Sequence, residues 1–151
     1  MNVQLRSPLV ETFDMQPHPE GGWYKELWKA SFEIPKHVLD PKYSGSRYAA
    51  TSIYFLLHEH EYSKWHTVYS DELWLWHSGS PLELTLGGDS LKPGDEQKII
   101  LGMDVANGQV PQALVPANVW QMARPLGSEP VFVSCVVAPG FHFDDFNMIA
   151  D

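Results

Sequence analysis

A histidine and a glutamate six residues apart, His66 and Glu72, are the side chains of this chain best suited to chemistry. Imidazole titrates near neutral pH, and a neighbouring carboxylate can orient the ring and raise its basicity. Such a pair suits abstraction of a proton next to a carbonyl group. Gln121, Tyr54 or Arg47 could then donate hydrogen bonds to the oxygen that becomes negative. The alternative is a buried, hydrogen-bonded pair that only satisfies the interior of the fold.

A metal ion at the same place would have His66, Glu72 and Gln121 as its donors. First-row metals normally take three or four good nitrogen or carboxylate donors, and a neutral amide is a poor substitute. His58 and His60 belong to a polar connector that follows a predicted strand, so we do not expect them to complete the set. We therefore expect no cofactor, and keep a metal held by the first three residues as the alternative.

Three further side chains are candidates for ligand binding. Trp74 and Trp76 lie in the same segment as Glu72, and aromatic faces pack against the C–H groups of sugars and ring-shaped ligands. Tryptophans are also ordinary core residues. Glu20 precedes Gly21 and Gly22, which allow a sharp turn and the close approach of another group. A turn of this kind presents Glu20 to a ligand or simply starts the next strand, and both interpretations stay open.

The rest of the sequence is typical of an all-β protein with one short helix near the N-terminus. Twelve prolines and eleven glycines separate short runs rich in β-branched and aromatic residues. Ser7 can cap the helix, and Pro8 suits its first position. The predicted strands cover residues 23–32, 48–57, 73–78, 82–86, 97–101, 113–115, 120–123 and 131–138. The longest irregular stretch, 34–47, is either a lid or interface arm, or a simple surface excursion.

Length and composition exclude several classes of protein. The 151 residues suit a single domain over 1–151 with a real core, and 44% of them are hydrophobic. A net charge of −9 repels phosphate backbones, so we expect no nucleic-acid partner. No run of about 18 apolar residues is present, so we expect no membrane association. The lone cysteine, Cys135, lies in a predicted buried strand and excludes an intrachain disulfide framework. With no signal-like N-terminus, this favours a cytoplasmic location.

Two short patterns carry a resemblance to a known family. The first is His66, Val68, Glu72 and Gly79, and the second is Pro116, Asn118 and Gln121. They resemble, in register, the two motifs of the cupin superfamily, except that Val68 and Gln121 stand where those motifs have histidine. With the stretches 17–22, 53–57, 65–66, 70–74, 81–84, 115–121 and 137–141, the chain is similar more narrowly to Cupin_5, a family of small single-domain cupins of unknown function.

The resemblance implies a double-stranded β-helix, which is a jelly-roll barrel with a ligand cavity at one mouth, and usually a homodimer. The arrangement is similar to that of cupins that isomerise or epimerise sugars without a metal. We therefore expect a cupin that binds a small polar metabolite, sugar-like or nucleotide-sugar-like. If it is an enzyme, it would be an isomerase or epimerase with His66 as base and Glu72 as its partner. The alternatives are a non-catalytic small-ligand binding cupin and a metal-dependent cupin enzyme with an unusual ligand set.

Overall fold

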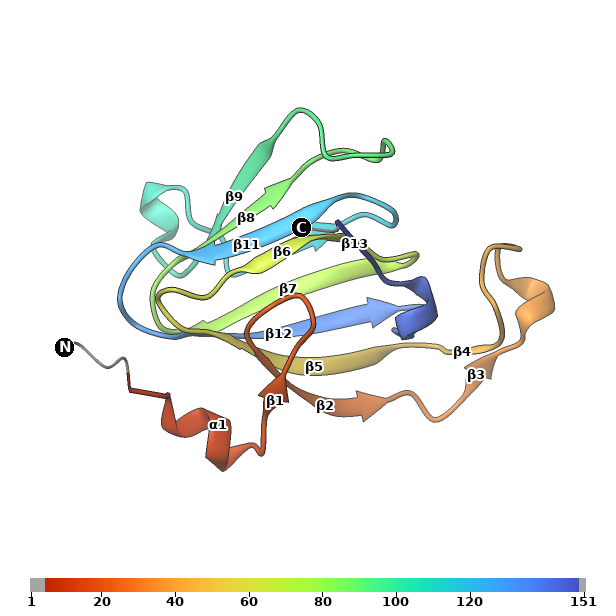
Figure 1. Ribbon diagram of the computed structural model, residues 1–151, viewed down its shortest axis with the longest axis horizontal. Coiled ribbons are helices and arrows are strands. Elements are labelled where there is room, and N and C mark those ends of the chain that lie inside the picture. Colours follow the sequence, from red (N-terminus) through yellow and green to blue (C-terminus); the bar gives the residue numbers. More distant parts are fainter. Residues whose placement is uncertain (1–4, 150–151) are drawn as a thin grey trace.

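Two antiparallel sheets pack against each other in the computed structural model, which describes residues 5–149 (Figure 1). In spatial order, the larger sheet contains β1 (Gln16–Pro17), β2 (Trp23–Lys29), β5 (Thr51–Leu57), β12 (Val131–Ala138), β7 (Asp71–Ser78) and β10 (Gln112–Val115). The smaller sheet contains β13 (Asn147–Met148), β6 (Ser63–Thr67), β11 (Gln121–Pro125), β8 (Leu82–Leu86) and β9 (Gln97–Leu101). This arrangement is the predicted all-β jelly-roll barrel, with one short N-terminal α-helix.

The main core fills the space between the two sheets. Alternate residues of β12, namely Val131, Val133 and Cys135, point into it from the larger sheet, while Leu82 and Leu84 of β8 meet them from the smaller one. Each of these side chains is almost fully buried. The two sheets therefore share one apolar interior, which leaves polar side chains inside the barrel concentrated at its mouth.

Helix α1 (Pro8–Thr12) covers the outer face of the larger sheet, and the expected cap is present. The Ser7 hydroxyl accepts a hydrogen bond from the Leu9 N–H at 3.2 Å, and Pro8 occupies the first turn. Val10 packs with Leu56 of β5 in a second, smaller core. Within residues 5–149, no helix is long and apolar enough to cross a membrane.

All eight predicted strands are present, with small shifts at their ends, but one important strand was missed. Strand β6 carries His66, and its sequence Ser-Lys-Trp-His-Thr has no apolar run that would mark it. Its buried side chains are polar, because Ser63 and His66 belong to the hydrogen-bonded interior at the mouth of the barrel. The predicted strand over 23–32 ends earlier, at Lys29.

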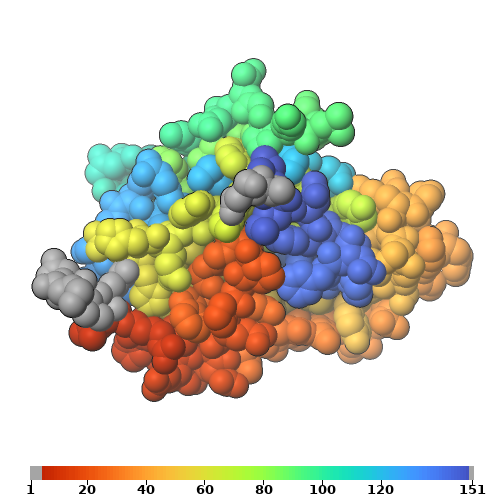
Figure 2. Space-filling view, in the orientation of Figure 1, coloured from red at the N-terminus to blue at the C-terminus, as the bar shows by residue number. Residues whose placement is uncertain are grey.

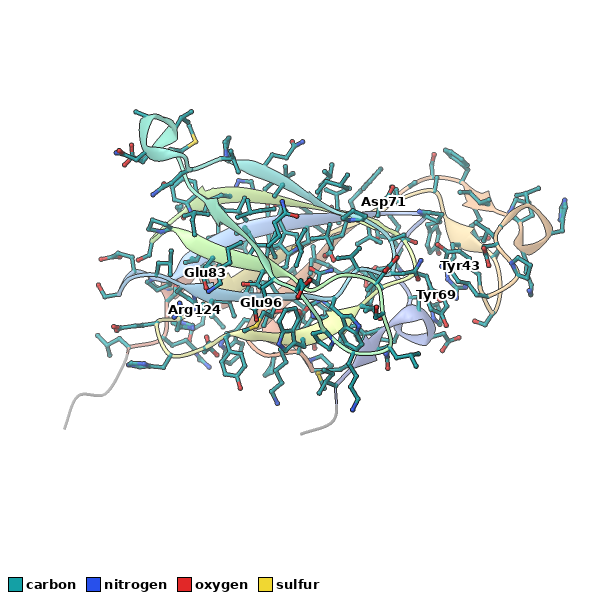
Figure 3. The ribbon with its side chains drawn as sticks, turned by 90° about the horizontal axis from the view of Figure 1, so that it is seen from above. Tyr43, Tyr69, Asp71, Glu83, Glu96 and Arg124 are labelled. Atoms are coloured by element: carbon teal, nitrogen blue, oxygen red, sulfur yellow. The ribbon has the colours of Figure 1, made fainter. Side chains whose placement is uncertain are left out.

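The segment 34–47, called the arm below, projects from one end of the barrel between β3 (Glu33–Ile34) and β4 (Arg47–Tyr48) and contains the 3₁₀ turn η1 (Lys36–Val38) (Figure 1). Its tip packs back onto the barrel, since Tyr43 donates a hydrogen bond to the Tyr69 carbonyl oxygen at 3.0 Å (Figure 3). Lys42 also donates to Asn118 at 2.9 Å. These contacts place the arm beside the mouth of the barrel.

Candidate active site at the barrel mouth

A cavity of about 600 Å³ occupies this end of the barrel. Its size lies in the range of small-molecule sites. Strands β2, β5, β6, β7 and β12 line it, together with arm residues 44–47 and the C-terminal segment 141–146 except residue 145. In Figure 2 this C-terminal segment, in blue, lies between the red N-terminal residues and the orange arm. The buried end of the cavity contains His18, Glu20, His66, Glu72 and Cys135.

The ring of His66 is held in one tautomer. Its Nδ1 lies 2.7 Å from the Lys64 carbonyl oxygen, which can only accept, so Nδ1 carries the proton. The same Nδ1 lies 3.1 Å from Glu20 Oε2. Nε2 has no hydrogen-bond partner among residues 5–149, although every fully buried side-chain nitrogen and oxygen there has one. Nε2 is therefore a free basic nitrogen that the cavity can reach.

Glu20 reaches His66 through the turn that contains the two glycines. Gly21 adopts φ +114°, and a Cβ there would lie 2.2 Å from the Tyr62 carbonyl oxygen, so only glycine lets this turn approach the start of β6. The Lys64 N–H then donates to the Glu20 carbonyl oxygen at 2.8 Å. The Ser63 hydroxyl donates to Glu20 Oε2, the oxygen that faces His66.

Burial raises the pKa of Glu20 to about 8, although the hydrogen bond from Ser63 opposes this shift. Burial, helped by the nearby His66, lowers the pKa of His18 to about 3. At neutral pH Glu20 is therefore protonated and His18 is neutral. His18 Nδ1 accepts from the Glu20 N–H at 3.1 Å and lies 3.3 Å from Glu20 Oε1.

Glu72 receives a hydrogen bond that crosses the barrel. Gln121 of β11 lies opposite His66 in the register with β6, and its Nε2 donates to Glu72 Oε1 of β7 at 2.8 Å. The Cys135 thiol lies beside the Glu72 carboxyl group and opposes the rise in its pKa. Burial raises the pKa of Glu72 to about 7 against the opposing effect of His66, so both protonation states are populated near neutral pH. Burial, assisted by Glu72, raises the pKa of the Cys135 thiol.

The structure brings His66 and Glu72 to the same cavity, but other groups, the Lys64 carbonyl oxygen and Glu20, contact Nδ1 of the histidine. We expected Glu72 to orient His66. Instead Glu20 lies at Nδ1 of the ring, while Glu72 is bonded to Gln121 and acts on His66 through its charge. Burial lowers the pKa of His66, and the nearby Glu72 opposes that shift. The site therefore contains two carboxyl groups on different sides of one imidazole.

Two predicted ligand-binding residues do not line the cavity. Tyr54 lies on the opposite face of β5, where its ring packs against Phe13 at 4.8 Å between centroids. Trp76 is four residues beyond Glu72 on the same strand, about 13 Å further along it at the rise of a β-strand. There its indole N–H donates to the Ser80 carbonyl oxygen at 3.1 Å, in the main core. Tyr54 is excluded because successive side chains of a strand point to opposite faces of the sheet. Trp76 is excluded because it lies too far along its strand from the mouth of the barrel.

Trp74 and Gln121 lie behind the lining residues rather than among them. The Trp74 indole N–H donates to Gln121 Oε1 at 2.9 Å, which turns the amide nitrogen of Gln121 toward Glu72. These two residues therefore position Glu72. Their predicted direct contact with a ligand finds no support in this arrangement.

A metal ion does not fit this set of donors. The Gln121 oxygen, which would be its metal-binding atom, is occupied by the Trp74 N–H, and Val68 contributes no donor at all. Across the described ranges, no group of three or more histidine, cysteine, aspartate or glutamate side chains is arranged to hold a metal ion. We therefore derive no chemistry through a metal.

Arg47 lines the cavity from the arm, but its charge is already matched. Its Nε and Nη2 donate to the two carboxylate oxygens of Asp145 at 2.9 and 2.7 Å, and both side chains are buried. Nη2 also donates to the Ser44 hydroxyl, which in turn donates to Asp144 at 2.8 Å. This pair joins the arm to the C-terminal segment. Aromatic and acidic residues alternate over 141–146, and no local signal in this pattern predicts that these residues line the site.

Comparison with known proteins agrees with this architecture. A hypothetical protein from Leishmania major superposes with a TM-score of 0.82 at 27% identity, covering 93% of this chain and 85% of that one. Protein SO0799 from Shewanella oneidensis superposes with a TM-score of 0.81 at 32% identity, covering 94% and 82%. Oxalate decarboxylase from Bacillus subtilis superposes with a TM-score of 0.57 at 12% identity, covering 90% of this chain and 30% of that one, and shows a shared fold alone.

The sequence comparisons lead to the same family. The uncharacterized protein YML079W of Saccharomyces cerevisiae is 27% identical over 153 residues, which cover 93% of this chain and 73% of that protein. A family model described as Cupin superfamily (DUF985) matches residues 7–149. The chain therefore belongs to the Cupin_5 family of the cupin superfamily, whose expected jelly-roll barrel it adopts.

Proposed function

We propose that this cupin binds a small polar, sugar-like metabolite in the mouth cavity and catalyses metal-independent proton transfer on it, as an isomerase or epimerase does. One observation carries the proposal: His66 presents an unpartnered Nε2 to the cavity while its Nδ1 is tied to Lys64 and Glu20. A histidine held in one tautomer, with its basic nitrogen free, is arranged as a general base.

The proton transfers follow from the positions of the two carboxyl groups. His66 Nε2 takes the proton from the carbon next to the carbonyl group, and the electron pair moves to the carbonyl oxygen. Glu72, whose pKa is raised to about 7, gives its proton to that oxygen. In an isomerisation Glu72 then takes the proton of the neighbouring hydroxyl group, and His66 gives its proton to the former carbonyl carbon. In an epimerisation Glu72 takes its own proton back, and the original carbon is protonated on its other face after the intermediate has turned in the cavity. Glu20 keeps the imidazole ring oriented throughout.

The experiment that tests this proposal is proton exchange with solvent. The protein is incubated in D₂O with a panel of aldoses, ketoses, amino sugars and nucleotide sugars, and NMR follows deuterium entry at the carbon next to the carbonyl group. We expect exchange with at least one member of the panel and a loss of about 10²-fold or more in His66→Gln, as for removal of a general base. The control is His60→Gln, a histidine with 80% of its side chain exposed.

Two outcomes would overturn the catalytic proposal. One is exchange that survives in His66→Gln at the rate of the unchanged protein. The other is binding of a panel member, seen as a shift in melting temperature, without exchange in any form of the protein. The second result would identify the chain as a non-catalytic binding cupin.

A further inference from the structure

We propose that the cavity selects a cationic, amine-bearing ligand and rejects phosphorylated or carboxylated ones. This inference rests on the proposed function in that it names the substrate class of the same cavity. The evidence for it is the charge and the aromatic residues of the cavity lining. This evidence does not depend on the tautomer of His66, which carries the proposed reaction. It narrows the sugar-like ligand to an amino compound and argues against nucleotide sugars.

The lining carries more acid than base. Five carboxyl side chains face the cavity, namely Glu20, Glu26, Glu33, Glu72 and Asp144. Only two cationic side chains do so, Lys29 and Arg47. An anionic ligand would meet the exposed carboxylates of Glu26, Glu33 and Asp144 at the rim, and at the buried end it would meet Glu72, which is partly ionised near neutral pH and poorly screened.

Both cationic side chains are already paired with acids. Lys29 Nζ lies 3.1 Å from Glu26 Oε1. The Nε and Nη2 atoms of Arg47 donate to the two carboxylate oxygens of Asp145, and its Nη1 donates to the Ser46 carbonyl oxygen at 2.8 Å. A phosphate or carboxylate would have to displace Asp145 to bind Arg47 in the same way, and at Lys29 it would compete with Glu26. At the buried end of the cavity only neutral histidines remain as possible partners for an anion.

Aromatic rings form the wall beside the buried acids. Around His18 the ring centroids of Tyr24, Phe146 and Phe143 lie at 4.7, 6.0 and 6.1 Å. Phe141 continues this wall, 5.0 Å from Phe143. The face of an aromatic ring attracts a cation, most strongly where water is excluded. Carboxyl groups beside aromatic faces are the chemistry that holds an ammonium group.

A cation bound at the buried end would release the proton of Glu20. The pKa of Glu20 is raised to about 8, and its carboxyl group faces His18, His66 and Ser63. A cation beside this carboxyl group favours its ionised form, so a permanent cation releases the proton as it binds, while Glu72 keeps the proton that the proposed reaction uses. The affinity for the cation should therefore rise as the pH is raised toward about 8.

The single cysteine provides a direct test, because Cys135 lines the cavity and is the only thiol in the chain. Methanethiosulfonate reagents of similar size are available with a trimethylammonium, a neutral methyl or a sulfonate group. The Cys135 thiolate attacks the sulfenyl sulfur, a mixed disulfide forms, and methanesulfinate leaves. Intact-protein mass spectrometry gives each rate, which is divided by the rate of the same reagent with free 2-mercaptoethanol.

We expect the normalised rate of the cationic reagent to exceed that of the anionic one by about tenfold or more. Glu72→Gln should reduce this ratio several-fold, and taking a ratio cancels any change in thiol reactivity. Glu83→Gln is the matched control, since it removes one carboxylate at the ion pair with Arg124, away from the cavity (Figure 3), and should leave the ratio unchanged.

A ratio of one or less would overturn the inference, and so would a ratio that Glu72→Gln and Glu83→Gln change equally. Failure of the neutral reagent to react even at a pH high enough to ionise the buried thiol would also overturn it, because a cavity closed to solvent selects no ligand. None of these rate ratios depends on turnover of a substrate. An absence of deuterium exchange would therefore refute the proposed reaction without affecting the charge selectivity. A failed rate ratio would refute the charge selectivity without affecting the proposed reaction.

Discussion

At the scale of single residues, the buried acids determine the chemistry of the site. Glu20 and Glu72 lie close to the same imidazole, and burial raises the pKa of both from an ordinary value of 4.5. An acid whose pKa is raised in the folded state binds its proton more tightly there than in the unfolded chain. The cluster therefore makes folding depend on pH.

This dependence gives a prediction for Glu20→Gln. Between about pH 4.5 and 8 the folded protein holds the Glu20 proton and the unfolded chain releases it, so Glu20 makes the free energy of unfolding fall as the pH rises through this window. His18, whose pKa is lowered from 6.5 to about 3, has the opposite effect below about pH 6.5. The Glu20 contribution amounts to a few kcal/mol. An amide at this position cannot ionise, so Glu20→Gln should remove this falling contribution and make the slope more positive. Urea unfolding at a series of pH values measures it, with the exposed Glu96→Gln as control. A profile with the same slope in Glu20→Gln and unchanged protein would contradict the argument.

At the scale of elements, one tight turn delivers Glu20 to β6. Gly21 and Gly88 both have positive φ, +114° and +74°, but their surroundings differ. A Cβ at Gly21 would clash with the Tyr62 carbonyl oxygen at 2.2 Å, whereas a Cβ at Gly88 would meet nothing within 4 Å. The turn therefore needs glycine at position 21 both for its positive φ and for its close approach to the Tyr62 carbonyl oxygen.

This difference predicts unequal effects of alanine at the two positions. Gly88→Ala should cost about 1–2 kcal/mol from backbone conformation alone. Gly21→Ala should cost about 1–3 kcal/mol more, because the chain must move away from β6. It should also weaken the proposed proton exchange by displacing Glu20 from His66. Chemical unfolding of both variants measures the costs, and equal values would show that the close approach does not matter.

At the scale of the whole molecule, the larger sheet ends in an incompletely paired strand. Strand β1 pairs only with Trp23 and Tyr24, so the remainder of β2 has an unpaired outer edge among the described strands. Leu27, Trp28 and Phe32 expose 53, 48 and 64% of their surface nearby. Open edges with apolar side chains are where chains associate. The expected homodimer stays a prediction, and this edge is where we expect a second copy.

Charge also suits such a pairing, since an antiparallel contact centred between Leu27 and Trp28 can set Glu26 opposite Lys29 of the second copy. We expect a dimer in sedimentation velocity experiments and a shift toward monomer in Trp28→Lys, which places a charge in the contact. Leu91→Lys is the control, because Leu91 is 97% exposed on a distant loop. A protein that sediments as a monomer, or a dimer that Trp28→Lys leaves intact, would contradict this placement.

Much of this protein follows from its sequence alone. Alternating apolar residues separated by proline and glycine determine the strands and turns of the all-β fold, since each depends on neighbours within a few residues. The spacing of His66, Glu72 and Gln121 likewise places them together, because the motifs fix which strand positions face the barrel interior. Strand β6 escaped prediction because its buried side chains are polar and no apolar alternation marks it.

Only the tertiary structure decided which residues meet at the site. Glu20 reaches His66 through a turn 46 residues earlier in the chain, and the Arg47–Asp145 pair spans 98 residues. The site also depends on which face of β5 and which depth of β7 adjoin the cavity, and this excludes Tyr54 and Trp76. Local patterns cannot encode these contacts, because they arise from strand register and barrel closure, which many distant residues determine together.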